Sequence, residues 1–269
     1  MSRTAPREAK RVDFVLANGR RSPGTVPAGM DGIGYCPAGQ TARLGRGGAT
    51  AIAWPDGRSC YYREFRHGGL LARMLGTRYL SRQPLEREIE NSRLLDLKGL
   101  LVPAPVLGRV ERRGLFVGLA LVTERIPGQT LLEALDAGTE KPLRPLLERV
   151  GRVVARMHEI GFRHRDMHPG NILVRADGEI VLIDLVDGRW GGRKGDRASI
   201  KSLVRMGRYL EKHGYLDRPP SATHVLTLLR GYEPDAQKRK ELFRRLRSSY
   251  RRELLWRRFF WFLGSKLSS

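Results

Sequence analysis

The chain has few cysteines and no long apolar run. Its 269 residues include only two cysteines, Cys36 and Cys60, and neither has a second Cys or a His nearby at metal-ligand spacing. Two cysteines cannot build a disulfide framework, so their scarcity indicates a reducing compartment. A membrane-spanning helix needs about 18 or more apolar residues in a row, and a secretory signal needs an apolar core near the N-terminus. Neither pattern is present, so we expect a cytoplasmic protein or one peripheral to a membrane.

Acidic residues are scarce relative to basic ones. Asp and Glu number 28 against 50 Lys and Arg, which gives a net charge of +22. Such an excess implies an anionic partner, and charge alone does not choose among nucleic acid, an anionic membrane face and a phosphorylated substrate. The length suits two lobes of one protein better than two independent domains.

The strongest chemical pattern is a loop that follows a predicted helix and leads into an apolar strand. His164, Arg165 and Asp166 are followed by Asn171, which gives the spacing of the kinase catalytic loop H-R-D-x-x-x-x-N. In that loop the Asp accepts the proton of the substrate hydroxyl, and the Asn oxygen binds Mg²⁺ on the phosphates of ATP. We therefore predict Asp166 as the catalytic base, Asn171 as a metal ligand, and His164 and Arg165 as structural support of the loop.

A second acidic position follows at the spacing that kinases use. An apolar strand, an Asp-Gly turn at residues 177–178 and a second apolar strand lead to Asp184, which we predict as the second Mg²⁺ ligand. Either motif alone would occur by chance in many chains, as ordinary polar residues beside a strand. Their order and spacing together predict an α+β, protein-kinase-like two-lobed fold, with a small β-rich N-lobe carrying one main helix and a mostly helical C-lobe.

The domain organisation follows from the positions of these motifs. We expect a poorly ordered lead-in over residues 1–30, the kinase N-lobe over 31–124, the hinge and C-lobe with the catalytic loop over 125–235, and a basic, aromatic C-terminal helix over 236–269. Residues 44–65 contain two β-rich runs around a Pro-Asp-Gly turn, which predicts a hairpin in the N-lobe.

The predicted nucleotide contacts lie in the N-lobe. Arg46, Gly47 and Gly48 precede the first strand of the hairpin, and glycines there let backbone amides approach a phosphate. Kinases carry a phosphate-binding Lys on the following strand, but no Lys lies between residues 10 and 98. Arg63 is the best-placed cation on that strand, with Arg66 as the next candidate. The alternative is that Arg63 only solvates the face of the strand.

Two further groups complete the nucleotide prediction. A partial helical stripe over residues 84–98 carries Glu88 and Glu90, and we predict Glu88 as the partner of the strand cation, with Glu90 second, unless these acids only solvate the helix. The sheet then ends in a predicted hinge, where the backbone of Glu124 and Ile126 is expected to contact the adenine.

The segment after Asp184 departs from the protein-kinase pattern. Leu185 and Val186 replace the usual Phe and Gly, and no Ala-Pro-Glu follows, so we do not expect a loop switched by phosphorylation. Arg189, Arg193 and Lys194 are instead expected to form a cationic lip. His168, inside the catalytic loop, is a candidate substrate contact.

The C-terminal region differs from the rest in character. Residues 238–258 contain ten Lys or Arg against two Glu, and an aromatic-rich stretch follows up to residue 263. Basic residues beside an aromatic end suit a helix lying in the interface of an anionic membrane, so we predict membrane attachment through 238–263. The alternative is a helix that packs its aromatic side chains on the large lobe.

Six further segments carry a family resemblance across roughly residues 44–190. They are Arg46-Gly47-Gly48, 63–73, Arg78-Tyr79-Leu80, Val102-Pro103-Ala104-Pro105, 112–116 and 123–128. Together with the catalytic loop they resemble the bacterial lipopolysaccharide kinases of the Kdo/WaaP type, nearest to the 3-deoxy-D-manno-octulosonic acid (Kdo) kinases.

The resemblance implies an activity and a set of roles. It implies transfer of the ATP γ-phosphate to a sugar hydroxyl, that of Kdo, on the lipid A inner core, at the cytoplasmic face of the bacterial inner membrane. It implies Asp166 as base, Asn171 and Asp184 as metal ligands, and Arg63 with Glu88 in the place of the kinase Lys–Glu pair. The implied partners are an anionic lipid-linked saccharide and an anionic membrane, which would account for the positive charge.

Other functions stay open at this point. A heptose kinase or another small-molecule kinase of the same fold is the near alternative, because the metal motif and the C-terminal region depart from the family pattern. A catalytically silent kinase-fold scaffold and a nucleic-acid binder belong to different classes. The intact Asp166, Asn171 and Asp184 disfavour the scaffold, and no base-stacking or groove-reading motif supports nucleic-acid binding.

Overall fold

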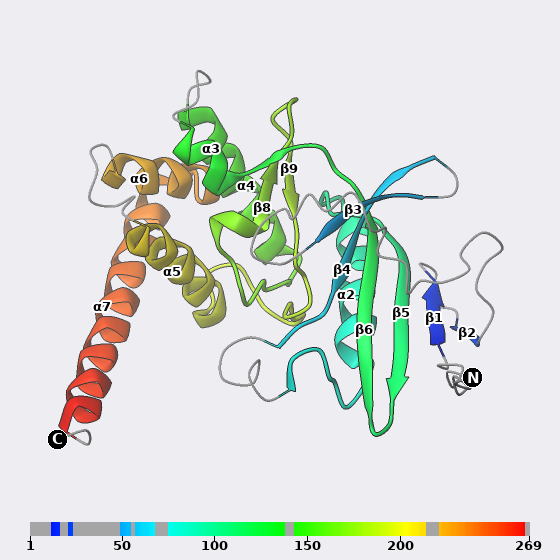
Figure 1. The fold of residues 1–269 in the computed structure, drawn as a ribbon. Coiled ribbons are helices and arrows are strands. Elements are labelled where there is room, and N and C mark those ends of the chain that lie inside the picture. Colours follow the sequence, from blue (N-terminus) through cyan, green and yellow to red (C-terminus); the bar gives the residue numbers. More distant parts are fainter. Residues whose placement is uncertain are drawn as a thin grey trace, which may run out of the picture. The chain divides into compact units, whose positions relative to one another are not determined.

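The chain folds into two compact units. The computed structural model describes residues 12–16, 21–23, 49–54, 57–67, 75–137, 143–213 and 221–266. The N-terminal unit comprises residues 1–97 and 102–126, and the C-terminal unit comprises residues 98–101 and 127–269 (Figure 1). The boundary thus lies two residues beyond the predicted hinge start, and the four residues after the N-terminal helix belong to the C-terminal unit.

The N-terminal unit is built on a six-stranded antiparallel sheet in the order β2-β1-β5-β6-β4-β3. Its strands are β1 (Val12–Leu16), β2 (Arg21–Pro23), β3 (Thr50–Ala53), β4 (Ser59–Glu64), β5 (Pro105–Arg113) and β6 (Phe116–Glu124). The predicted hairpin is present as β3 and β4. The long β5–β6 hairpin turns at Gly114, whose φ of 66° suits a glycine.

Two of these strands lie in the segment predicted as a poorly ordered lead-in. β1 pairs with β5 from Val12 opposite Glu111 to Leu16 opposite Leu107, and β2 pairs with β1. The lead-in prediction was therefore wrong for residues 12–16 and 21–23. The hydrogen-bonding partner of β1 is about ninety residues away along the chain, so local sequence patterns give no sign of the pairing. The rest of residues 1–30 lies outside the described residues.

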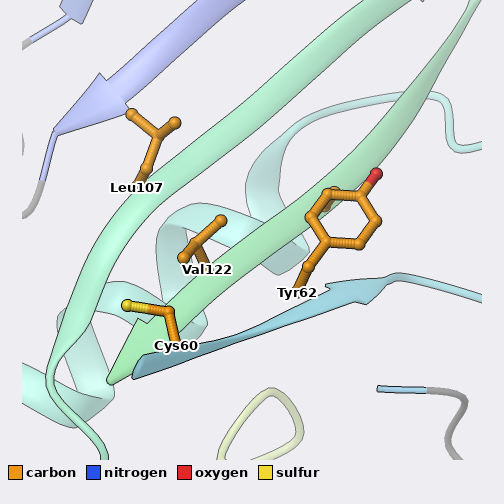
Figure 2. Close-up of a cluster of buried hydrophobic side chains, with 5 residues drawn as sticks. Cys60, Tyr62, Leu107 and Val122 are labelled. Atoms are coloured by element: carbon orange, nitrogen blue, oxygen red, sulfur yellow. The ribbon is translucent and has the colours of Figure 1, made fainter. Parts of the chain in front are cut away.

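Helix α2 (Gln83–Leu97) packs on one face of this sheet. A side chain at Gly108 in β5 would meet Ile89 at 3.0 Å and Leu85 at 3.1 Å, so the glycine allows the helix to approach the strand. Figure 2 shows part of the cluster on the opposite face, which comprises Cys60, Tyr62, Leu107, Ala120 and Val122. Because side chains alternate along a strand, Arg63 of β4 points to the α2 face.

The C-terminal unit is mostly helical. Its elements are β7 (Gln129–Thr130), α3 (Leu131–Asp136), α4 (Leu143–Glu159), the 3₁₀ turn η1 (Pro169–Asn171), β8 (Ile172–Val174), β9 (Ile180–Leu182), α5 (Arg197–Lys212), α6 (Ser221–Tyr232) and α7 (Ala236–Lys266). The three strands form a small sheet in the order β7-β8-β9. No helix in the part of the chain that the structure describes is both long enough and apolar enough to cross a bilayer.

Helices α4 and α6 cross at very close range. Ideal Cβ atoms at Gly151 and Gly231 would lie 2.1 Å and 2.0 Å from backbone oxygens of the facing helix. Next to this crossing, the buried His158 accepts or donates a 2.9 Å hydrogen bond with the Tyr232 hydroxyl, and burial lowers the pKa of His158 to about 4. The histidine is therefore neutral at physiological pH and belongs to the core.

The close crossing makes a stability prediction. Gly151→Ala should destabilise the C-terminal unit by at least about 2 kcal/mol, because the added methyl meets backbone that cannot move aside without separating the helices. Gly207→Ala in α5 is the matched control, since nothing lies within 4 Å of a Cβ there. That control should gain up to about 1 kcal/mol. The measurement is urea denaturation of each variant; equal midpoints for the two would contradict the crossing.

Candidate active site

The β8–β9 hairpin places the two predicted metal ligands at one end of the small sheet. Ile172 pairs with Leu182, so Asn171 stands just before β8 and Asp184 follows shortly after β9. The N–H of Ile183 donates to the carbonyl of Asn171 at 3.1 Å, which continues the pairing beyond the strands. The hairpin register thus brings together two residues that are 13 positions apart in sequence.

Asn171 is hydrogen-bonded to the backbone of the predicted base, Asp166. It is 6% exposed, and its side-chain Nδ2 donates to the backbone carbonyl of Asp166 at 2.9 Å. The hydrogen bond assigns the orientation of the amide, because only the nitrogen can donate to a carbonyl. The side-chain oxygen Oδ1 is then the atom of Asn171 that can act as a metal ligand.

Asp184 adopts an unusual backbone conformation. Its φ is +58°, the only positive φ of a non-glycine residue in the described ranges. The left-handed conformation costs a residue with a Cβ about 1–2 kcal/mol, and such strain concentrates at functional sites. The next residue, Leu185, is 1% exposed, so the leucine fills an apolar position immediately after the carboxylate. The strained turn separates the buried apolar side chain of Leu185 from the carboxylate of Asp184.

Two basic side chains flank Asp166. Nε of Arg205, from α5, lies 3.2 Å from Oδ1, and Nε2 of His168 lies 3.6 Å from Oδ2. The neighbouring imidazole of His168 and the charge of Arg205 hold the pKa of Asp166 below its ordinary value, although partial burial opposes them. Asp166 is therefore ionised at neutral pH, as a general base must be before it accepts a proton.

His168 has a defined tautomer. Its Nδ1 accepts from the N–H of Gly170 at 3.1 Å, so its proton is on Nε2, the nitrogen that faces Asp166. The imidazole ring stacks on Tyr209 of α5, with ring centroids 4.6 Å apart and planes 8° apart. The structure places His168 beside the predicted base; its predicted contact with substrate stays a prediction.

The residues predicted to support the loop do so through different atoms. His164 is fully buried, and its Nε2 hydrogen-bonds the carbonyl of Ile183 at 2.9 Å. Burial lowers the pKa of His164, so it is a neutral bridge between the loop and the strand that leads to Asp184. The side chain of Arg165 is exposed; its backbone carbonyl accepts a hydrogen bond from Arg205.

Arg205 is a contact of the predicted base that sequence reasoning missed. It contacts both the carboxylate of Asp166 and the carbonyl of Arg165, across 39 and 40 positions of sequence. The only local signal is a basic residue on an amphipathic helix, which α5 offers several times. Nothing in the sequence distinguishes this arginine from its neighbours.

Arg63 and Glu88 form an ion pair within the N-terminal unit. Nη2 of Arg63 lies 2.5 Å from both carboxylate oxygens, and the side chains of Arg63 and Glu88 are 25% and 7% exposed. The guanidinium also lies 5.0 Å from the centre of the Phe65 ring. Glu90 is exposed, so the partner is the first of the two predicted acids. Binding of nucleotide by the pair stays a prediction.

The remaining predicted nucleotide contacts are only partly described. The N–H groups of Glu124 and Arg125 donate to Ala104 and Ser59 at 2.9 Å each, so both are used within the sheet. Ile126 is therefore the candidate N–H donor to an adenine from this segment. Arg46, Gly47 and Gly48 lie outside the described residues.

The expected cationic lip after Asp184 needs a correction. Nζ of Lys194 lies 3.0 Å from Glu159 and 3.6 Å from Glu233, and it is 5.2 Å from the centre of the Tyr232 ring. Its charge is thus neutralised by Glu159 at the end of α4 and by Glu233 just after α6, which the local sequence could not reveal. Arg189 is held by paired backbone hydrogen bonds to Arg163.

The donor set fits magnesium carried by a nucleotide. Among the described residues, no group of three or more His, Cys, Asp and Glu side chains could hold a metal ion alone. Mg²⁺ usually binds one or two protein carboxylates and completes its shell with substrate phosphates and water. The oxygens of Asn171 and Asp184, two hard ligands at one end of a hairpin, match that requirement.

Comparison with known proteins places the chain in a family. The model of the lipopolysaccharide kinase (Kdo/WaaP) family matches residues 42–232, well over half of the sequence. The chain belongs to this family. The predicted resemblance is thereby confirmed, and the matched residues include Arg63, Glu88 and the whole catalytic loop.

Relatives within the family carry a more specific description. The chain is 37% identical over 146 residues to a 3-deoxy-D-manno-octulosonic acid kinase of Stenotrophomonas maltophilia (strain K279a), covering 52% of this chain and 57% of that protein. It is 36% identical over 181 residues to the kinase of the same description from Xanthomonas campestris pv. campestris (strain B100), covering 62% and 68%. The match thus spans less than two thirds of the Stenotrophomonas protein.

A solved structure supports the fold. WaaP in complex with acyl carrier protein aligns with 80% of this chain and 87% of its own chain, with a TM-score of 0.54 and 23% sequence identity. At that identity the likeness concerns the fold alone. The predicted α+β kinase-like class, with an antiparallel N-terminal sheet, one main helix and a helical C-terminal part, is confirmed.

The contacts of Asp166 predict how its acidity responds to mutation. His168→Phe keeps the ring on Tyr209 but removes both nitrogens, so the pKa of Asp166 should rise toward its ordinary value. The stability that the ionised carboxylate contributes is present above the unfolded-state pKa and is lost as the pH falls through the lower folded-state pKa. In the variant this contribution should therefore be smaller, and its loss should be complete at a higher pH than in wild type.

Carboxyl ¹³C titration by NMR, assigned with Asp166→Asn, measures this shift. His213→Phe is the control, because His213 also stacks on Tyr209, at 4.4 Å, and has no contact with Asp166 among the described interactions. An unchanged titration of Asp166 in His168→Phe would rule out the imidazole of His168 as a cause of the lowered pKa.

The ion pair in the N-terminal unit allows stability and function to be separated. Arg63→Met should cost about 3 kcal/mol, because it leaves the carboxylate of Glu88 buried without a cation. Arg63→Met combined with Glu88→Gln removes that uncompensated charge and should recover most of the stability. Both variants should still raise the KM for ATP or depress kcat, and Arg63→Lys should retain part of the activity.

Denaturation curves and steady-state kinetics of the three variants measure the two effects. A double variant that is stable and has normal constants for ATP would limit Arg63 to a structural role. The phosphate-binding cation would then lie elsewhere, and Arg66, whose side chain is 70% exposed, is the next candidate.

Proposed function

We propose that this protein is an ATP-dependent kinase that phosphorylates a sugar hydroxyl, that of Kdo, on a lipid-linked saccharide of the lipopolysaccharide inner core. The observation that carries the proposal is the geometry of the predicted catalytic loop. The side chain of Asn171 donates a hydrogen bond to the backbone carbonyl of Asp166, and the ionised carboxylate of Asp166 lies between Arg205 and His168. Membership of the lipopolysaccharide kinase family and the description of its relatives as Kdo kinases support the choice of acceptor.

In the proposed reaction Asp166 orients the acceptor hydroxyl and takes its proton. The hydroxyl oxygen forms a bond to the γ-phosphorus, the bond from that phosphorus to the β-phosphate oxygen breaks, and ADP leaves. Asn171 and Asp184 would hold Mg²⁺, which neutralises charge on the phosphates when bound. Arg63, oriented by Glu88, would position the phosphates in the place of the kinase lysine. ATP and Mg²⁺ are the proposed cofactors.

We further propose that the enzyme works as a peripheral protein at the cytoplasmic face of the inner membrane. The net charge of +22 would draw it to an anionic leaflet. Membrane attachment was predicted for all of residues 238–263, but the first part of this segment packs within the C-terminal unit. Leu242 is 6% exposed, and Leu246 lines a cavity together with residues of α5. The first half of α7 is therefore part of the C-terminal unit, and the side chains beyond residue 252 lie outside the described residues.

The activity is tested with an Asp166→Asn variant. Purified protein is incubated with labelled ATP and a Kdo-bearing lipid A precursor, and in parallel with a heptosylated core acceptor. Wild-type protein should phosphorylate the Kdo acceptor, and Asp166→Asn should lower kcat by about a thousandfold or more while leaving ATP binding intact. Asp184→Asn should also lose metal-dependent ATP binding.

The outcomes separate the alternatives. Phosphorylation of the heptosylated acceptor alone would change the assigned acceptor and keep the enzyme class. A folded Asp166→Asn variant with near-normal turnover would remove Asp166 from the catalytic role.

Membrane attachment is tested by truncation after residue 252. Removal of 253–269 should preserve the fold and activity on a soluble Kdo-containing fragment, but weaken binding to anionic vesicles and slow the phosphorylation of membrane-presented acceptor. High salt should mimic part of the effect, because exposed charges are screened beyond about 8 Å at physiological ionic strength. Equal loss of activity on soluble and membrane-presented acceptors would indicate a folding role for this segment instead.

A further inference from the structure

A large open groove lies between α5 and α7 in the C-terminal unit. It encloses about 680 Å³. Arg197 and Lys201 of α5 line one wall, and Arg245 and Arg252 of α7 line the other, together with Ser248 and Ser249. Helix α7 packs on α5 here, so both walls belong to one folded unit (Figure 1).

The four cationic side chains of this groove have no carboxylate partners among the described residues. Among the described residues no carboxylate forms an ion pair with any of them, although Lys194 nearby is paired with two glutamates. Arg245 is anchored by a 2.6 Å hydrogen bond to the carbonyl of Gly195, which neutralises no charge. Like charges that face each other across a groove repel, so the arrangement favours an anion between the walls.

The chemistry of the lining points to phosphate. The guanidinium and ammonium groups donate N–H hydrogen bonds to phosphate oxygens, and the serine hydroxyls donate O–H hydrogen bonds. An arginine can donate two parallel hydrogen bonds to one phosphate group. The volume is that of a site for a drug-sized ligand and far exceeds one phosphate ion. A saccharide that bears phosphate groups matches both the charge and the size.

The groove is aligned with the catalytic residue along α5. Arg197, Lys201 and Arg205 follow one another at steps of four residues, so they share one side of the helix. The row is about 12 Å long at 1.5 Å per residue. Arg205 at its end contacts Asp166. A ligand held in the groove can therefore extend toward the base, which favours the acceptor itself over bulk lipid as the occupant.

We propose that the α5–α7 groove binds the phosphate groups of the lipid-linked acceptor and so positions its sugar hydroxyl at Asp166. The proposal rests on the proposed function and adds to it a site for the phosphorylated part of the substrate. Bulk anionic lipid headgroups and nucleic acid carry the same phosphate chemistry and are outcomes of the test.

The test compares two variants that remove equal charge. Lys201→Gln with Arg252→Gln takes one cation from each wall, and Arg247→Gln with Arg251→Gln takes two exposed cations from the opposite side of α7. The probes are a Kdo-bearing phosphorylated saccharide lipid in neutral-detergent micelles and the same lipid after enzymatic removal of its phosphates. Activity and direct binding are measured for each.

The groove variant should raise the KM for the phosphorylated acceptor about tenfold, because exposed charge-assisted contacts are lost. Its kcat, its KM for ATP and its KM for the dephosphorylated acceptor should stay within about twofold of wild type. The control variant should behave as wild type on both acceptors. An equal rise for the two acceptors, an equal rise in the control variant, or no rise at all would overturn the proposal.

The binding measurements separate this proposal from the proposed function. If wild-type protein phosphorylates neither acceptor, the proposed function fails, and the groove is judged by binding alone. A wild-type preference for the phosphorylated lipid that the groove variant loses supports the site; no preference overturns it. An equal loss of binding to phosphatidylglycerol vesicles without acceptor, or to duplex RNA, would assign the groove to bulk lipid or to nucleic acid and also overturn the proposal.

Discussion

The hydrogen bond from the side chain of Asn171 to the backbone carbonyl of Asp166 is the constraint on which the site depends. It closes the loop between the predicted base and a predicted metal ligand, and it assigns which atom of the Asn171 amide remains to bind a metal ion. The β8–β9 register then places Asp184 beside the same loop, and His164 ties the loop to that strand. Main-chain bonding thus brings together the predicted base and the two predicted metal ligands, and Arg205 and His168 add side-chain contacts to Asp166.

The parts that sequence predicted are those encoded locally. Asp166, Asn171 and Asp184 lie within one loop and one hairpin, where spacing determines geometry, and the amphipathic pattern of α4 determines a helix. The pairing of β1 with β5 and the contact of Arg205 with Asp166 span long separations, so no local pattern encodes them. Lys194 was wrongly predicted as part of a cationic lip for the same reason: its partners, Glu159 and Glu233, are distant in sequence.

The ion pair between Arg63 and Glu88 makes contacts that a lysine could not make in full. The guanidinium reaches both carboxylate oxygens and lies over the Phe65 ring, contacts that suit a planar, delocalised cation. The side chain of Glu88 is only 7% exposed, so solvent screens its charge little and the carboxylate orients the guanidinium of Arg63. A lysine could supply the charge, but it could not supply the fork and the stacking together.

The positive charge of the C-terminal unit is divided between two uses. Lys194 is neutralised by acids and lies on an aromatic ring, so it contributes to the fold. The cations of the α5–α7 groove face each other without acids, and Arg205 continues their row to the base. Repulsion within such a row costs stability in the free protein, and a bound anion relieves it. These cations on α5 and α7 are thus a local anion-attracting feature within the overall net charge of +22.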